Sequence, residues 1–124
     1  MAKRTSEKKN FKVIIKNSTD QINNISVQGP NSRKILEKII FTPPTQPTIS
    51  ELQWFRFSIC RLEELNGIPL IVSRTGYTGE LGYEVWCHPD HAPQVWDKVM
   101  EAGKKDGLIP AGFGALDLLR IEAG

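Results

Sequence analysis

Apolar and polar residues alternate in several stretches of the chain, which is the pattern of strands with one buried face. These stretches are residues 11–16, 24–28, 54–65, 68–73 and 83–87. The pair Asn66-Gly67 separates two of them, and this pair favours the tight turn of a β-hairpin. The alternation therefore predicts a mostly antiparallel sheet.

Helical spacing replaces the alternation in three segments. Residues 29–32 supply a break and N-cap candidates for a helix whose apolar stripe is Ile35, Leu36, Ile39 and Ile40. A second helix begins at about Ala92 and ends near Gly103, and a third covers residues 115–123. Three prolines within residues 42–50 predict an extended connector.

Strands that pair through hairpins and are interrupted by helices predict an α+β fold, with helices on one face of the sheet and a ferredoxin-like order. We expect the sheet to pack against the helix of residues 92–102. The predicted core consists of Phe55, Phe57, Ile59, Val95, Trp96 and Val99. Because this fold class hosts many functions, it identifies none.

Length and charge limit the organisation of the chain. A chain of 124 residues is about one small domain. Residues 1–12 hold five of the 16 basic residues and one of the 14 acidic residues, so the remainder carries a net charge of −2. We interpret residues 1–10 as a basic, flexible tail and residues 11–124 as the folded part. Because the folded part does not carry a net positive charge, we expect no nucleic-acid partner.

The apolar runs and the cysteines indicate a protein of the cytoplasm. The longest apolar run, residues 67–72, is too short to span a membrane, and no signal-peptide pattern follows the basic start. Cys60 and Cys87 lack disulfide or zinc spacing, so we expect free thiols. The cluster Cys87-His88-Pro89-Asp90-His91 is too compact for a structural zinc site, and we predict no metal.

Residues 73–84 form the most informative segment, because three glycines at intervals of three residues separate two predicted strands. Such a loop permits close approach of its backbone to a flat ligand. Tyr77 would offer a stacking ring and Glu84 a carboxylate at the start of the next strand. From the loop alone, a tight structural connection is an equally good interpretation.

Three motifs together resemble the aminomethyltransferase family, represented by the T-protein of the glycine cleavage system. The turn "VQGP" stands at residues 27–30, the loop "SRTGYTGELGYE" at 73–84, and "GFGALDLLRIEAG" at 112–124 is similar to the family's "GLGARDxLRxEAG" helix. The resemblance covers roughly residues 11–124. It implies that the chain is a central segment of the family's folate-binding domain, cut off at its C-terminus.

The resemblance also implies a function in one-carbon metabolism. Members of the family transfer an aminomethyl carbon from a lipoyl-carrying H-protein to tetrahydrofolate and release ammonia. Carried over by position, Glu84 would bind the amino edge of the pterin and Tyr77 would line the folate site. The chemistry fits, since a carboxylate can accept both hydrogen bonds of that two-donor edge.

Two departures from the family limit this expectation. Leu116 replaces an arginine that takes part in folate binding, which keeps open a tetrahydrofolate-dependent demethylase or methyltransferase, or a folate-binding module without catalysis. The family's catalytic aspartate lies upstream of the matched region. We therefore assign no catalytic residue within this chain and expect the isolated chain to be inactive.

Overall fold

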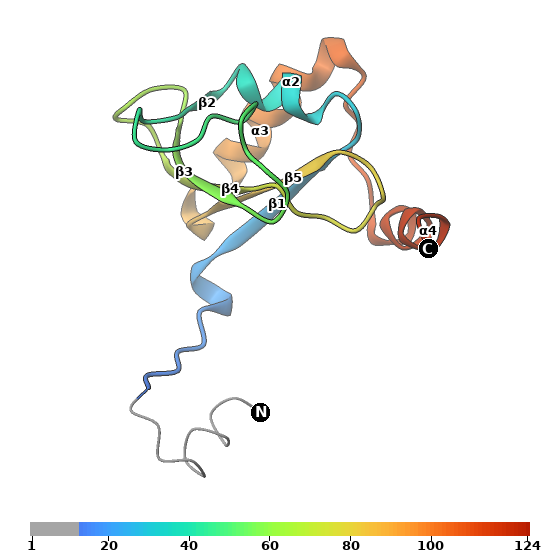
Figure 1. Cartoon of the computed structure of the whole chain (residues 1–124), viewed down its shortest axis with the longest axis horizontal. Coiled ribbons are helices and arrows are strands. Elements are labelled where there is room, and N and C mark those ends of the chain that lie inside the picture. The colour runs from blue at the N-terminus through green and yellow to red at the C-terminus, as the bar shows by residue number, and fades with distance from the viewer. Residues whose placement is uncertain (1–12) are drawn as a thin grey trace.

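The computed structural model describes residues 13–124, which form a five-stranded antiparallel sheet with helices packed against it (Figure 1). The order across the sheet is β1-β5-β4-β3-β2. The strands are β1 (Asn23–Gln28), β2 (Ile40–Phe41), β3 (Phe57–Leu62), β4 (Pro69–Ser73) and β5 (Gly82–Cys87). The helices are α2 (Ser32–Glu37), α3 (Ala92–Gly103) and α4 (Phe113–Glu122), with 3-10 turns η1 (Thr19–Gln21), η2 (Pro89–His91) and η3 (Lys104–Asp106). The predicted α+β class is confirmed.

The strand β5 lies between β1 and β4 and thereby connects the first strand to the rest of the sheet. It pairs with β1 on one side, where Ile25 lies opposite Val85, and with β4 on the other, where Val72 lies opposite Val85. The hairpin between β3 and β4 turns through Asn66-Gly67, as the sequence predicts. A long-range pairing therefore places β1 beside residues about 60 positions later.

One face of the sheet is buried under α2, α3 and the connector between β2 and β3 (Figure 1). Because side chains alternate between the two faces of a strand, every second strand residue points into this core. The buried cluster comprises Ile25, Val27, Leu36, Ile39, Ile49, Leu52, Cys60, Leu62, Leu70, Val72, Tyr83, Val85, Cys87, Ala92, Val95 and Val99.

The predicted core is correct for two residues of α3 and wrong for the other four predicted residues. Val95 and Val99 are buried, but Trp96 is 42% exposed. Phe57 and Ile59 lie on the other face of the sheet, with 59% and 46% of their surfaces exposed, and Phe55, which precedes β3, is 80% exposed. The small residues that alternate with Phe57 and Ile59 along β3, Ser58 and Cys60, point inward instead. The alternation was recognised, but the face that it buries was not.

The inward position of Ser58 shows why a polar residue can take the buried face. Its hydroxyl donates a hydrogen bond of 2.7 Å to the carbonyl oxygen of Pro47 in the connector. A buried hydroxyl with a partner avoids the cost of desolvation. The proline-rich connector, which has neither helix nor strand between residues 42 and 50, thus lies over this end of the core.

Two predicted elements also differ at their ends. Residues 13–16 form no strand, because no other strand pairs with them in the described part of the chain. Helix α2 ends at Glu37, so that Ile40 belongs to β2 and not to the helical stripe. The predicted tail of residues 1–10, and residues 11 and 12 of that first strand, lie outside the described residues.

An ion-pair cluster ties α2 to the end of α3. The carboxylate of Asp106 accepts hydrogen bonds from Lys34 (2.7 Å) and Lys38, and Lys38 also donates to the carbonyl oxygen of Ala102 at 2.9 Å. Only 9% of the Asp106 side chain is exposed. The hydrogen bonds from Lys34 and then Lys38 lower the pKa of Asp106 below its ordinary value.

We expect Val99→Ala to lower the free energy of unfolding by roughly 1 to 3 kcal/mol, because it removes buried methyl groups between α3 and the sheet. Denaturant unfolding measures the change. The matched control is Gln94→Ala, an exposed position on the same helix, where we expect a change within about 0.5 kcal/mol. Equal effects of the two substitutions would show that this face of α3 is not core.

We expect Asp106 to contribute to stability in a pH-dependent way. A pKa that is lowered by folding gives stabilisation that is complete above the unfolded value of about 3.9 and is lost as pH falls through the lower folded value. Unfolding midpoints measured between about pH 6 and pH 2 should therefore fall less steeply in Asp106→Asn than in the unsubstituted chain. An equal slope in Asp106→Asn and in the unsubstituted chain would contradict this contribution.

Candidate functional site

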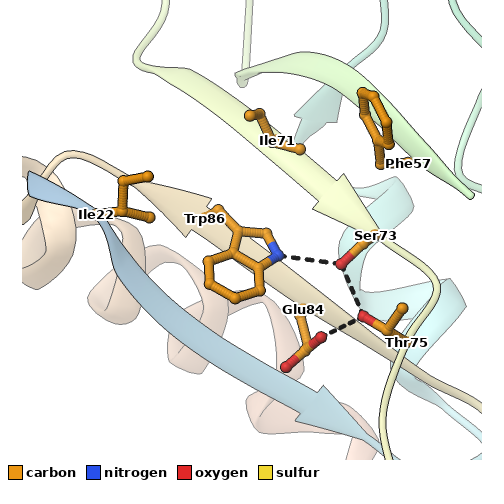
Figure 2. A pocket seen from close by; sticks show the side chains of 7 residues that line it. All are labelled: Ile22, Phe57, Ile71, Ser73, Thr75, Glu84 and Trp86. Carbon is orange, nitrogen blue, oxygen red and sulfur yellow. Dashed lines mark hydrogen bonds between the residues drawn. The ribbon is translucent and has the colours of Figure 1, made fainter. Parts of the chain in front are cut away.

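The face of the sheet opposite the core carries an open pocket of about 410 Å³. Figure 2 shows the seven residues that line it, which are Ile22, Phe57, Ile71, Ser73, Thr75, Glu84 and Trp86. The register explains why they meet, because Ile71 is paired with Trp86 and Ser73 with Glu84 across β4 and β5. In each strand these residues are two positions apart, so they share one face.

A chain of hydrogen bonds crosses the pocket and ends at Glu84 (Figure 2). The indole Nε1–H of Trp86 donates to Ser73 Oγ at 3.0 Å, and Ser73 Oγ lies 2.8 Å from Thr75 Oγ1. The hydroxyl of Thr75 donates to Glu84 Oε2. Because Thr75 has only one hydroxyl proton, Ser73 must donate to Thr75. Each hydrogen bond in this series is therefore donated in the direction of the Glu84 carboxylate.

The second oxygen of Glu84 is fixed by another strand. Asn24 Nδ2 on β1 donates to Glu84 Oε1 at 3.0 Å. A carboxylate has about four acceptor positions, and these two hydrogen bonds occupy one on each oxygen. The protein thus orients Glu84 from both sides and leaves each oxygen able to accept one more hydrogen bond.

Apolar side chains surround this single carboxylate. Trp86 lies beside Glu84, while Phe57, Ile71 and Ile22 form the remaining apolar wall (Figure 2). Apolar pockets with a few fixed polar groups are typical of small-molecule sites. The arrangement suits a ligand with a flat apolar surface and a donor-bearing edge.

The structure places the residues singled out in the sequence at different distances from this pocket. Glu84 lines it, whereas Tyr77 is on the glycine loop, is 54% exposed, and is not among the lining residues. Leu116 lies half-buried on α4 and is also outside the lining set. Helix α4 approaches the loop at Gly79, where a methyl group in place of the glycine hydrogen would stand 2.7 Å from Cβ of Ala123.

Sequence reasoning assigned only Glu84 of the lining residues to the site. It missed Asn24 and the other six lining residues, which are Ile22, Phe57, Ile71, Ser73, Thr75 and Trp86. One signal was available, since Trp86 follows Glu84 by two residues in a predicted strand and must share its face. The contribution of Asn24 depends on the pairing of β1 with β5, and no local pattern encodes it.

The cysteines and histidines lie elsewhere. Cys60 and Cys87 are free and buried, and burial raises the pKa of the Cys87 thiol. His88 caps η2 by accepting a hydrogen bond of 3.3 Å from the backbone N–H of Asp90. Within residues 13–124, no three His, Cys, Asp or Glu side chains are grouped to hold a metal ion. In the same range, no helix is both long and apolar enough to cross a membrane.

Comparison with known proteins gives consistent matches along the chain. The sequence profile of the family described as "GCVT N-terminal domain" matches residues 1–124. The chain is 57% identical to the trimethylamine-oxide aldolase of Ruegeria pomeroyi over 114 residues, which are 92% of the chain and 14% of that protein. It is 44% identical to the aminomethyltransferase of Halothermothrix orenii over 115 residues, which are 93% of the chain and 30% of that protein.

A second aminomethyltransferase, from Caldanaerobacter subterraneus, is 43% identical over 92% of the chain and 29% of its own length. The chain thus spans less than a third of the length of these relatives. Its match to the family profile extends over all 124 residues. The chain belongs to the GCVT N-terminal domain family, which confirms the resemblance that its three motifs indicated.

Proposed function

We propose that the open face of the sheet binds the pterin ring of tetrahydrofolate and that Glu84 is its principal polar contact. One observation carries the proposal: a carboxylate oriented by Thr75 and Asn24 stands in an apolar pocket beside Trp86. A pterin presents a ring N–H and an exocyclic NH₂ side by side. The free acceptor position on each oxygen of Glu84 suits this pair of donors.

The walls of the pocket support the same ligand. A flat heteroaromatic ring gains contact area against Trp86 and Phe57 while its donor edge meets the carboxylate. We also propose Tyr77 as a further folate contact, because its exposed ring lies on the loop that begins beside Thr75. This role is independent of the hydrogen bonds that fix Glu84.

For the reaction, we propose a one-carbon transfer to tetrahydrofolate by a longer protein that contains this segment. The aminomethyltransferase relatives support transfer of an aminomethyl carbon. The resemblance to the T-protein family implies a lipoyl-carrying H-protein as the donor and the release of ammonia. No residue of this chain is assigned as catalytic, and we expect the isolated chain to have no turnover. Two free cysteines fit a reducing compartment such as the cytoplasm.

A second candidate donor is a methylated amine. The 57% identity to a trimethylamine-oxide aldolase and the presence of Leu116 both favour it. Loss of one methyl carbon from trimethylamine oxide as formaldehyde leaves dimethylamine, and formaldehyde condenses with tetrahydrofolate to give the methylene derivative and water. Both candidates can therefore pass their carbon to the same folate acceptor, and they differ in the source of that carbon.

We expect Glu84→Gln in the longer protein to weaken tetrahydrofolate binding by roughly tenfold to a hundredfold, because an NH₂ group would replace one acceptor and the negative charge is lost. Isothermal titration calorimetry measures the affinity. Glu80→Gln is the matched control, since Glu80 lies exposed in the same loop outside the pocket and should bind as before. Unchanged affinity in Glu84→Gln would remove Glu84 from the site.

The two donors are distinguished by product analysis. We expect the longer protein to form methylenetetrahydrofolate from only one of two mixtures, aminomethylated H-protein or trimethylamine oxide, each with tetrahydrofolate. Ammonia should accompany the first reaction and dimethylamine the second. The 124-residue chain serves as the control and should yield neither product. Turnover by that chain would contradict the absence of a catalytic residue in it.

A further inference from the structure

We propose that Gln28 is a positioning residue for the pocket, because the glycine loop of residues 75–82 folds around its side-chain amide. Gln28 is the last residue of β1 and is not among the residues lining the pocket. Its effect on a ligand would be indirect, through Thr75 and Glu84. Only that effect on ligand binding depends on the proposed function; the organisation of the loop does not.

The amide of Gln28 contacts both ends and the middle of the loop. Its Nε2 group lies 3.3 Å from the carbonyl oxygen of Thr75 and 3.4 Å from that of Tyr83, and 3.0 Å from Ser26 Oγ. Its Oε1 atom accepts a hydrogen bond of 3.2 Å from Thr78 Oγ1. The two Nε2 protons are shared among three acceptor oxygens, and Oε1 accepts a hydrogen bond. Both ends of the Gln28 amide are therefore hydrogen-bonded.

The glycines show how closely the loop backbone approaches this amide. A methyl group built on Gly82 would stand 1.7 Å from Oε1 of Gln28, and one on Gly76 would stand 2.5 Å from the same atom. Gly82 does not have a positive φ, so its conformation does not require glycine, and the obstacle to a side chain at this position is the nearby Gln28 amide. The Gln28 amide thus lies against two of the three glycines in the spaced motif, and Gly76 also has a positive φ of 154° that favours glycine by itself.

This contact reaches the pocket through Thr75. The carbonyl oxygen of Thr75 accepts a hydrogen bond from the Gln28 amide. The Thr75 hydroxyl donates to Glu84, as Figure 2 shows. Thr75 in turn accepts from Ser73, which accepts from the indole of Trp86. Loss of the Gln28 amide should therefore loosen the loop, displace the Thr75 hydroxyl and change the environment of the Trp86 indole proton.

The first test concerns the loop itself. In this chain, Gln28→Ala should increase the hydrogen-exchange rates of loop amides by about tenfold or more while exchange at core residues Val72 and Val85 stays close to the original. The Trp86 indole resonance should shift in the ¹H–¹⁵N spectrum. Gln53→Ala is the control, because the Gln53 amide donates to the nearby carbonyl of Glu51 and, among residues 13–124, to no other group. Equal effects in both variants would overturn the proposal.

A double-mutant cycle provides a second, independent test. Gly82→Ala should lower Tm, and the loss should shrink to about half or less when Gln28 is also alanine, because the clashing amide is gone. Additive losses would show that the amide is not what excludes a side chain at position 82. If Gly82→Ala alone does not fold, recovery of folding in the double variant supports the proposal and continued failure contradicts it.

Affinity measurements on two variants distinguish the role of Gln28 from the proposed folate binding. Tetrahydrofolate affinity of the longer protein should fall in Gln28→Ala as well as in Glu84→Gln. A loss in Glu84→Gln alone would overturn Gln28 as a positioning residue and keep folate binding. Loosening of the loop with unchanged affinity in both variants would instead contradict the folate proposal and support the structural role of Gln28 in the loop.

Discussion

The position of β5 between β1 and β4 is the constraint on which the rest of the structure depends. Strand alternation sends Tyr83 and Val85 into the core and Glu84 and Trp86 to the open face. The same strand therefore anchors the helices and presents the site. Its two neighbours supply the groups that orient Glu84, with Asn24 from β1 and Ser73 and Thr75 from β4 and its following loop.

The sequence predicts this arrangement in part, because local patterns carry local structure. Alternation located the strands, and Asn66-Gly67 located a hairpin, since both signals depend on neighbouring residues. The face of β3 was mistaken because Phe57 and Ile59 are the more apolar members of the alternation, whereas Ser58 and Cys60 face the helices. Hydrophobicity predicts which residues tend to be buried, but the space between the sheet and α2, α3 and the connector determines which side chains can be packed there.

The candidate site divides in the same way. Glu84 was singled out from a motif in one segment, whereas Asn24 donates to it, and Gln28 to the neighbouring Tyr83 carbonyl, from a strand about 60 residues earlier. No periodicity links these positions; only the antiparallel register of β1 and β5 does. Residues 13–16 show the complementary case, because alternating residues without a partner strand form no sheet.

The proposed function assigns recognition of the acceptor to this segment and leaves the carbon donor to the longer protein. Aminomethyltransferases and a trimethylamine-oxide aldolase both match nearly all of the chain, although it is a small part of each. A shared folate acceptor is the simplest chemistry common to the two proposed donors. Leu116 does not line the pocket, so any effect of this residue on folate binding would be distinct from that of Glu84.

The most direct measurement follows the indole N–H resonances of this chain during titration with a stable reduced folate at millimolar concentration. Trp86 lines the pocket, whereas Trp96 lies on α3 against the opposite face of the sheet and serves as an internal control. The account predicts a saturable shift of the Trp86 resonance, little change at Trp96, and loss of the response in Glu84→Gln. No shift at Trp86, or an equal shift at both residues, would contradict a pterin site on the open face.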